Sequence, residues 1–207
     1  SISLAVAAGP EGLPAVITIT LAVGMQRMAR EKAILRKLSS IEALGSATVI
    51  ATDKTGTLTK NEMRVTKFWL EGINYSSHDK TLQLSHASFS RLITTGVICN
   101  NASLVYKHDH GKYDILGDTT EGALLLLAQD KGLISEQAKQ NGTLVEEFAF
   151  DPTLKMMTVV WESHKQKTIY TKGAPESVLK SCTLDEQSRQ NIEAEFREYA
   201  KEGLRVI

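Results

Sequence analysis

Asp53 opens a short loop whose residue types could carry out phosphoryl chemistry. The apolar run 47–52 directly precedes it and is typical of a short buried strand in a parallel sheet. Such sheets place reactive groups on the loops that leave the carboxyl ends of their strands. Gly56 lets the backbone turn tightly, and successive loop N–H groups with neighbouring threonine hydroxyls can bind an anion. Asp53 is therefore a candidate nucleophile toward phosphate. The alternative is an Asx turn that uses the same residue types to cap the next segment.

The segment 53–59 reads DKTGTLT and resembles the phosphorylation signature of the P-type ATPases. These ion pumps carry a phosphoryl group on that aspartate, within a haloacid-dehalogenase-like domain. The resemblance implies that Asp53 attacks the γ-phosphorus of ATP in line, and that water later hydrolyses the aspartyl-phosphate. It also implies a Mg²⁺ site made by Asp53 and the backbone carbonyl of Thr55, with Thr57 on the phosphoryl oxygens. Lys54 would either stabilise phosphate or pair with a neighbouring acid.

Residues 1–24 form an apolar run in which Glu11 is the only charged residue. A run of about 20 such residues can span a bilayer, and the lack of a basic segment before it argues against a signal peptide. Pro10 and Pro14 would break a continuous helix and free backbone carbonyls. We therefore expect residues 1–24 to be part of a proline-broken transmembrane helix. A buried core helix is the alternative.

The break in this run, PEGLP, places an acid among free carbonyls. A carboxylate inside a membrane is costly and marks a functional candidate, and Ca²⁺ prefers about six to eight oxygen ligands. Residues 4–23 resemble the fourth transmembrane helix of calcium-type P-type pumps. The resemblance implies that Glu11 is an ion ligand together with the carbonyls of Val6, Ala7 and Gly9. It favours Ca²⁺ as the transported cation, although calcium pumps tend to carry a larger apolar residue at the position of Gly9.

Basic side chains follow the apolar run, which is typical of the cytoplasmic end of a membrane span. They are Arg27, Arg30, Lys32, Arg36 and Lys37. We therefore expect the chain after about residue 25 to be cytosolic, in a parent protein that crosses the membrane several times and contacts lipid. Apolar residues at helical spacing predict a stalk helix over 25–44, and a surface amphipathic helix is the alternative.

The pattern changes after Met63. Strand-like runs at 66–70, 157–161 and 168–171 are interleaved with helical segments. This mixture favours an α+β domain built on an antiparallel sheet.

The resemblance to P-type pumps divides the rest of the chain into domains. Residues 45–63 would be the first part of the phosphorylation domain, which is an α/β fold. Residues 64–204 would be the nucleotide-binding domain that these pumps insert into it, and residues 205–207 the start of the return hinge. The fold class expected for the cytosolic part is therefore α/β and α+β.

Glu121 is the first candidate for the nucleotide pocket. It ends the sequence DTTE at 118–121, which resembles the DPTE motif of the family and implies contact with the amino group of adenine. An acid at a helix cap with Glu three residues later is also the spacing of a capping box. The two roles are compatible.

Phe150 and Lys155 lie in the sequence FDPTLKMM, which resembles the family's FDSxRKxM. The resemblance implies that Phe150 stacks on adenine and that Lys155 faces the nucleotide. An aromatic residue on a strand is more often part of a core, but the neighbouring motifs favour stacking here. Leu154 replaces the family's arginine, so no phosphate contact is implied at that position.

Lys172 and Gly173 begin the sequence KGAPE, which matches a motif of the family. Lys172 would reach into the nucleotide pocket, while Gly173 permits close backbone approach and Pro175 suits the first turn of a helix. Arg205 resembles an arginine at the second inter-domain hinge of these pumps, where it contacts the phosphates of ATP.

The overall composition excludes several classes of function. Lys plus Arg and Asp plus Glu are 24 each, so the formal net charge is zero and no nucleic-acid partner is indicated. Cys99 and Cys182 are far apart, with neither disulfide nor zinc spacing. The sequence HDH at 108–110 is typical of a solvated hairpin. Residues 185–202 predict a packing helix that stops at Gly203.

Two other classes of function stay open. A soluble phosphatase of the haloacid-dehalogenase type also uses an aspartate nucleophile, but usually in DxD rather than DKTGT, and the PEGLP segment argues against it. Alternatively, the 207 residues act only as a nucleotide-binding module. The TGD and GDGxNDxP motifs that complete the site of P-type pumps do not occur in this sequence. We therefore expect this fragment to bind ATP weakly and not to turn it over by itself.

Overall fold

The computed structural model describes residues 12–37, 39–108 and 111–207. The chain divides into two compact units, residues 1–58 and residues 59–207. The predicted cation ligands lie outside the described residues, and they stay predictions: Val6, Ala7, Gly9 and Glu11.

The first unit begins with helix α2, Leu13–Arg30. Pro14 stands in its first turn, where a missing N–H costs little. The hydroxyls of Thr18 and Thr20 donate to backbone carbonyls four residues earlier, each at 2.8 Å. Within the described ranges, no helix has both the length and the apolar character needed to cross a membrane.

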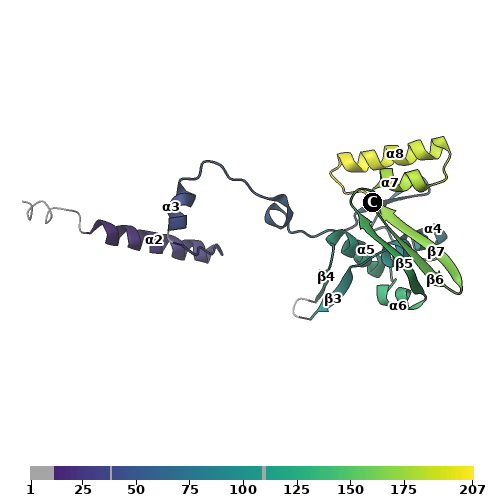
Figure 1. The fold of residues 1–207 in the computed structure, drawn as a ribbon, viewed down its shortest axis with the longest axis horizontal. Coiled ribbons are helices and arrows are strands. Elements are labelled where there is room, and N and C mark those ends of the chain that lie inside the picture. Colours follow the sequence, from purple (N-terminus) through teal and green to yellow (C-terminus); the bar gives the residue numbers. More distant parts are fainter. Residues whose placement is uncertain (1–11, 38, 109–110) are drawn as a thin grey trace, which may run out of the picture. The chain divides into compact units, whose positions relative to one another are not determined.

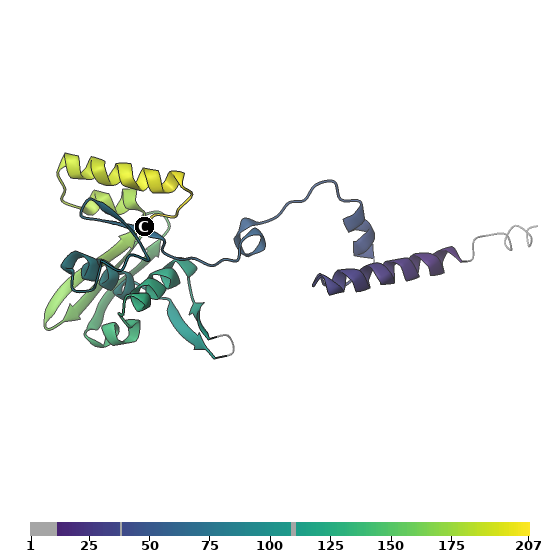
Figure 2. The ribbon, with the colours of Figure 1, turned by 180° about the vertical axis from the view of Figure 1, so that it is seen from behind.

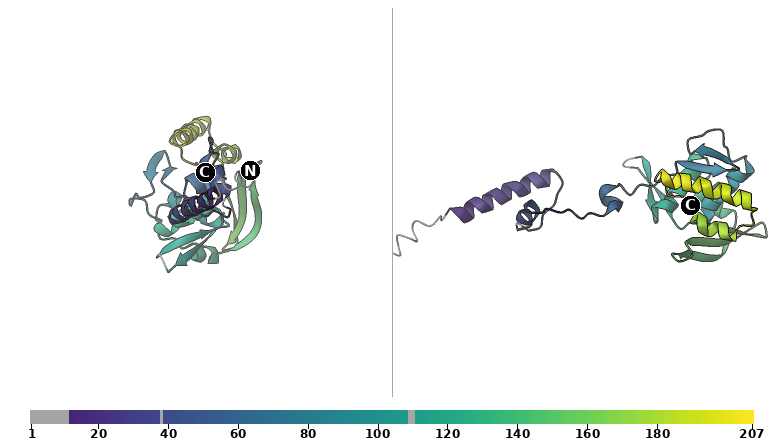
Figure 3. Two further views of the ribbon diagram at one scale, coloured as in Figure 1. Left: turned by 90° about the vertical axis from the view of Figure 1, so that its left-hand side faces the viewer. Right: turned by 90° about the horizontal axis from the view of Figure 1, so that it is seen from above.

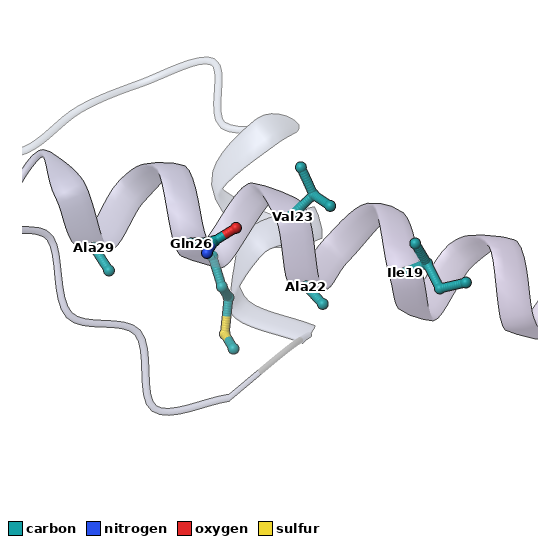
Figure 4. Close-up of a pocket in the computed structure, with 6 residues that line it drawn as sticks. Ile19, Ala22, Val23, Gln26 and Ala29 are labelled. Atoms are coloured by element: carbon teal, nitrogen blue, oxygen red, sulfur yellow. The ribbon is translucent and has the colours of Figure 1, made fainter.

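The predicted stalk segment 25–44 is divided in the structure. Helix α2 continues to Arg30, Lys32 has a positive φ of 64°, and helix α3 spans Ser39–Gly45. Helix α3 packs close to α2, since a Cβ on Gly24 would lie 3.9 Å from Cγ2 of Ile41. Figure 4 shows a shallow hollow on α2 without a titratable side chain, and its labelled lining residues are Ile19, Ala22, Val23, Gln26 and Ala29.

Residues 47–52 do not form the predicted strand and are exposed. A parallel strand needs hydrogen-bonded neighbours, and all sheets of the described chain lie between Lys67 and Gly173 and are antiparallel. The loop Lys54–Leu58 follows, with non-helical backbone at Thr55 and a φ of 74° at Gly56. The tight turn expected at this glycine is therefore present.

The second unit contains two hairpins and a three-stranded sheet, all antiparallel (Figure 1). The predicted α+β architecture on an antiparallel sheet is thus confirmed. The sheet has the order β5-β6-β7. The strands are β1 Lys67–Leu70, β2 Ile73–Ser76, β3 Ser103–Lys107, β4 Lys112–Leu116, β5 Thr143–Asp151, β6 Met156–Ser163 and β7 Gln166–Gly173.

Helix α4 connects the first hairpin to the second, α5 and α6 connect the second hairpin to the sheet, and further helices follow the sheet. The helices are α4 Ala87–Ile98, α5 Thr119–Asp130, α6 Ser135–Gln140, α7 Pro175–Val178, the 3₁₀ turn Leu179–Ser181 and α8 Glu186–Lys201. Helix α8 matches the packing helix predicted over 185–202.

Helix α8 packs with α7 and against the first hairpin, and it is the yellow helix of Figures 2 and 3. The hydroxyl of Tyr199 donates to the side chain of Asn74, and Lys67 forms an ion pair with Glu202 at 2.5 Å. These contacts fix the last helix to the start of the second unit.

Two apolar clusters meet at α4. The larger one joins α4 to α5 and the first hairpin, and the smaller one joins the end of α4 to the sheet through Cys99, Met157 and Val159. Cys99 donates its thiol to the carbonyl of Met157 at 3.4 Å, and burial raises its pKa. Helix α5 and the face of β6 and β7 are therefore held on either side of α4. The larger cluster consists of Phe68, Leu82, Phe89, Ile93, Val97, Ala102, Leu125, Leu127 and Ala128.

Candidate functional site

Asp118 caps helix α5 and fixes its first turn. Its Oδ1 accepts hydrogen bonds from the backbone N–H groups of Thr120 at 2.8 Å and Glu121 at 3.0 Å. Burial alone raises the pKa of Asp118, but these hydrogen bonds and nearby Arg205 together hold it below its usual range. The cap predicted from the sequence is therefore present.

Glu121 does not return a bond to the cap as a capping box would require. Its Oε2 instead accepts the backbone N–H groups of Asn101 at 2.9 Å and Ala102 at 3.1 Å, in the turn that joins α4 to β3. Its Oε1 lies 2.5 Å from Nζ of Lys172 on β7. Both carboxylate oxygens are thus engaged by groups from other elements.

The Glu121–Lys172 ion pair is mostly removed from solvent, with side chains 16% and 15% exposed. Two of the sequence-predicted pocket residues, 51 positions apart, are therefore in direct contact. Charges withdrawn from water in this way need partners, because an unpaired charge there is strongly destabilising. Glu121 and Lys172 form a polar floor between α5 and β7.

Phe150 joins this site through an irregularity in β5. Phe148 pairs with Thr158 and Asp151 pairs with Met156, so Ala149 and Phe150 together face the single residue Met157. This extra residue is a β-bulge. Met157 in turn pairs with Lys172. The bulge therefore places Phe150 in the same cross-strand row as Lys172, and the residue is 57% exposed.

Lys155 and Gly173 meet where β5, β6 and β7 come together. Lys155 has a φ of 54°, and its carbonyl accepts the N–H of Ala174 at 2.9 Å. A Cβ on Gly173 would overlap that carbonyl and lie 2.8 Å from Cα of Met156. The close approach predicted for Gly173 is therefore made to the chain's own backbone.

The side chain of Lys155 forms an exposed ion pair with Glu176 at 3.1 Å. Backbone hydrogen bonding and Lys155 lower the pKa of Glu176. Because exposed ion pairs contribute little free energy, Lys155 can exchange this partner for a ligand at small cost.

Arg205 reaches back to the start of α5. Its guanidinium donates to Oγ1 of Thr120 at 2.9 Å, one residue before Glu121. The end of the chain is thereby fixed to the turn that supplies the polar floor. Arg205 therefore adds a positive charge at the capped start of α5.

Asp53 belongs to the first unit, and its carboxylate bonds to the residue next to it in the sequence. Its Oδ1 accepts the backbone N–H of Lys54 at 2.7 Å, and the side chain is exposed. Across the described parts of the chain, no three acidic, histidine or cysteine side chains cluster as a metal site would need. Thr55, whose carbonyl is the other predicted ligand, lies two residues later in the chain, and the Mg²⁺ site stays a prediction. Mg²⁺ takes few protein ligands and completes its shell with water and phosphate oxygens.

A family model described as the cytoplasmic domain N of P-type ATPases matches residues 88–207. The chain belongs to the P-type ATPase family. All six pocket residues predicted from the sequence lie inside the matched range: Glu121, Phe150, Lys155, Lys172, Gly173 and Arg205.

This P-type ATPase chain is similar over its whole length to several curated proteins. It is 38% identical to a calcium-transporting ATPase of Bacillus subtilis, covering 26% of that protein. It is 36% identical to the cation-transporting ATPase pma1 of Synechocystis and to the human calcium-transporting ATPase type 2C member 1, covering 26% and 25% of them. The chain spans about a quarter of the length of these relatives.

Four further residues surround the polar floor of this P-type ATPase and were not predicted. They are Asn100, Asn101, Lys139 and Glu147. An Asn pair between a helix and a strand is a turn signal that sequence reasoning could have used. Nothing in the sequence around Lys139 or Glu147 marks them, because their contacts join segments about 40 residues apart.

Proposed function

We propose that this chain is the ATP-binding and phosphoryl-accepting part of an ATP-driven cation pump. The observation that carries the proposal is the mostly desolvated Glu121–Lys172 ion pair, whose Lys172 shares a cross-strand row with exposed Phe150, inside the range that matches domain N. An aromatic face beside a carboxylate and a lysine suits a purine nucleotide, which offers a π-surface, an amino donor and an anionic tail.

In the proposed complex, adenine stacks on Phe150 and its amino group donates to Glu121. The base takes the place of Lys172 at Oε1 of Glu121, since Oε2 is already held by two N–H groups. Lys172 then turns toward the phosphates, and Lys155 leaves its exposed pair with Glu176 to join it. Arg205 supplies further positive charge from the start of α5.

In the proposed phosphoryl transfer, a carboxylate oxygen of Asp53 attacks the γ-phosphorus of ATP in line. A new oxygen–phosphorus bond forms on Asp53, the bond to the β-phosphate oxygen breaks, and ADP leaves with the electron pair. Thr57 hydrogen-bonds the transferred oxygens. Asp53 and the carbonyl of Thr55 would hold Mg²⁺, which neutralises phosphate charge when bound. Water later hydrolyses the aspartyl-phosphate.

We further propose that the parent protein is a membrane pump and that Ca²⁺ is its cargo. The support is the resemblance of the PEGLP segment to calcium-type pumps and the names of the relatives, two of the three being calcium-transporting ATPases. Ion-stimulated ATPase activity of the full-length parent, compared across Ca²⁺, Mn²⁺, Na⁺ and H⁺, tests this. A pump that responds to Na⁺ or H⁺ alone would contradict the assignment.

The pocket is tested by titrating ATP against the 207-residue chain and its Phe150→Ala variant, with tryptophan fluorescence as the signal. We expect the variant to bind about five- to a hundredfold more weakly, because a base–aromatic stack contributes about 1–3 kcal/mol. Leu154→Ala is a matched control, since Leu154 is also exposed and lies near Phe150 in the sequence. Equal affinities of wild type and Phe150→Ala would remove Phe150 from the pocket.

Phosphorylation is tested separately in the full-length parent. We expect a hydroxylamine-sensitive phosphoenzyme from labelled ATP, abolished in Asp53→Asn. We expect none from the 207-residue chain alone, which would then act as a nucleotide-binding module. The second unit supports that reading, because the whole predicted pocket lies within residues 59–207. A stable phosphoenzyme on the isolated chain would overturn this part.

A further inference from the structure

The turn that holds Glu121 is itself rigidly built. Asn100 is only 3% exposed, and its amide donates to the carbonyls of Gly96 at 2.8 Å and Glu121 at 2.9 Å. Its Oδ1 accepts the N–H of Ala102 at 2.9 Å. The end of α4, the start of β3 and the first turn of α5 are therefore tied together at one side chain.

Two more contacts tie this turn to the segment that carries Phe150. The side-chain amide of Asn101 donates to Oε1 of Glu147 on β5 at 2.7 Å, and Glu147 lies three residues before Phe150. Lys139, at the end of α6 and just before β5, donates to the carbonyl of Asn100 at 3.0 Å. Burial lowers the pKa of Lys139, although Glu121 and Glu147 oppose this effect.

The two sides of the proposed pocket belong to different elements, because Glu121 lies on α5 and Phe150 on β5. Asn101 touches both, because its backbone N–H holds Oε2 of Glu121 and its side chain holds Glu147. A carboxylate can recognise the amino group of a stacked base only if it lies level with the base plane. The position of β5 relative to the turn therefore decides whether that bond forms.

We propose that Asn101 is a positioning residue of the nucleotide pocket, which aligns Glu121 with a purine stacked on Phe150 by bonding Glu147. This inference rests on the proposed nucleotide site. Asn101 does not touch the nucleotide itself. Replacing its side chain leaves the backbone bond to Glu121 in place, so a variant tests the link to β5 alone.

The test compares ATP with an analogue, purine riboside triphosphate, that lacks the amino group of adenine. Binding of both is measured on the 207-residue chain by fluorescence, alongside thermal unfolding. For Asn101→Ala we expect ATP affinity to fall about three- to tenfold, while affinity for the analogue stays unchanged. Glu147→Ala should behave alike. The double variant should lose no more ATP affinity than either single variant, because each single substitution already removes the same Asn101–Glu147 hydrogen bond.

Two variants serve as controls. Glu147→Gln keeps an acceptor oxygen and should retain most of the selectivity for ATP. Glu146→Ala alters the neighbouring acid of the same strand and should change neither affinity. Equal losses of ATP and analogue binding in Asn101→Ala, or no loss of either, would overturn the proposal. A wild-type chain that fails to bind both nucleotides would instead refute the proposed site.

Discussion

At the residue scale, Glu121 and Lys172 neutralise each other's charge, and the carboxylate is further held by two backbone N–H groups. In the proposed complex, a nucleotide would bring one hydrogen-bond donor for Glu121 and one anion for Lys172. Proposed binding would therefore exchange one contact for two without leaving either charged side chain unpaired.

Gly173 shows a residue whose role is steric rather than chemical. We expect Gly173→Ala to lower the free energy of unfolding by about 1–3 kcal/mol, because the new methyl group would overlap the backbone at Lys155 and Met156. Since those atoms belong to the chain turn that also carries Lys155, ATP affinity should fall as well. Urea unfolding followed by circular dichroism measures the first effect.

Gly96→Ala provides the matched control for that substitution. A Cβ on Gly96 would lie 3.4 Å from the side chain of Leu124, which is an ordinary contact, and alanine favours a helix. We expect this variant to be as stable as wild type or slightly more stable. If both variants unfolded at the same urea concentration, the steric role of Gly173 would be wrong.

At the scale of elements, the start of α5 combines helix capping with ligand positioning. Asp118 caps the helix, Thr120 holds Arg205, and Glu121 holds the turn before β3. Because these three contacts lie in one helical turn, removing the cap at Asp118 should disturb the proposed pocket. If the proposed nucleotide site is right, stability and nucleotide binding are coupled at this element.

Asp118→Ala should lower the free energy of unfolding by about 1 kcal/mol at pH 7, because it removes an N-cap. Asp118→Asn keeps the cap geometry and isolates the charge. The folded-state pKa of Asp118 lies below its ordinary value of 3.8, so the unfolded chain binds more protons in the window below that value. The stabilisation is thus complete above about pH 4 and is lost as pH falls through the folded pKa.

The stability difference between wild type and Asp118→Asn should accordingly shrink on acidification through this window, as measured by urea unfolding at several pH values. Taking the difference between the unfolding free energies of the two proteins cancels the contributions of the other carboxylates with lowered pKa values. These are Asp79, Asp151, Glu176 and Asp185. A difference that stayed constant with pH would show that the charge of Asp118 does not contribute.

Sequence motifs named the candidate pocket residues but not the contacts that hold them in the fold. Glu121 and Lys172 could be named from short motifs, whereas their ion pair joins positions 51 residues apart and depends on the packing of both α5 and β7 against α4. The capping-box spacing predicted the role of Asp118 correctly, but the carboxylate of Glu121 accepts the N–H groups of Asn101 and Ala102 instead of the cap N–H. The bulge at Phe150 is set by pairing with β6 and has no local signal.

The strand predicted over 47–52 failed for a related reason. An apolar run becomes a parallel strand only when at least one neighbouring strand supplies hydrogen bonds to it. The described sheets contain no such neighbour for this run. The helix predicted over 185–202 succeeded because its cap at Asp185 and its amphipathic face are local features.

At the scale of the whole molecule, the two units differ in how they are stabilised. Every buried residue in the described chain lies in the second unit, from Phe68 onward, while α2, α3 and the loop 54–58 contain none. Large buried side chains such as Phe89 and Leu125 each contribute about 1.5–3 kcal/mol. The second unit therefore has its own source of stability.

From this difference we predict that residues 59–207 fold alone. Both apolar clusters, the Tyr199–Asn74 bond and the whole predicted pocket are retained in that segment, so its midpoint of thermal unfolding should match that of the 207-residue chain within about 3 °C. Its ATP affinity should also be unchanged, since Phe150, Glu121 and Lys172 are all present. A single cooperative transition in calorimetry is expected for a domain of this size. A lower midpoint with unchanged ATP affinity would show that residues 1–58 stabilise the domain without forming the pocket, and a loss of affinity would place part of the pocket in the first unit.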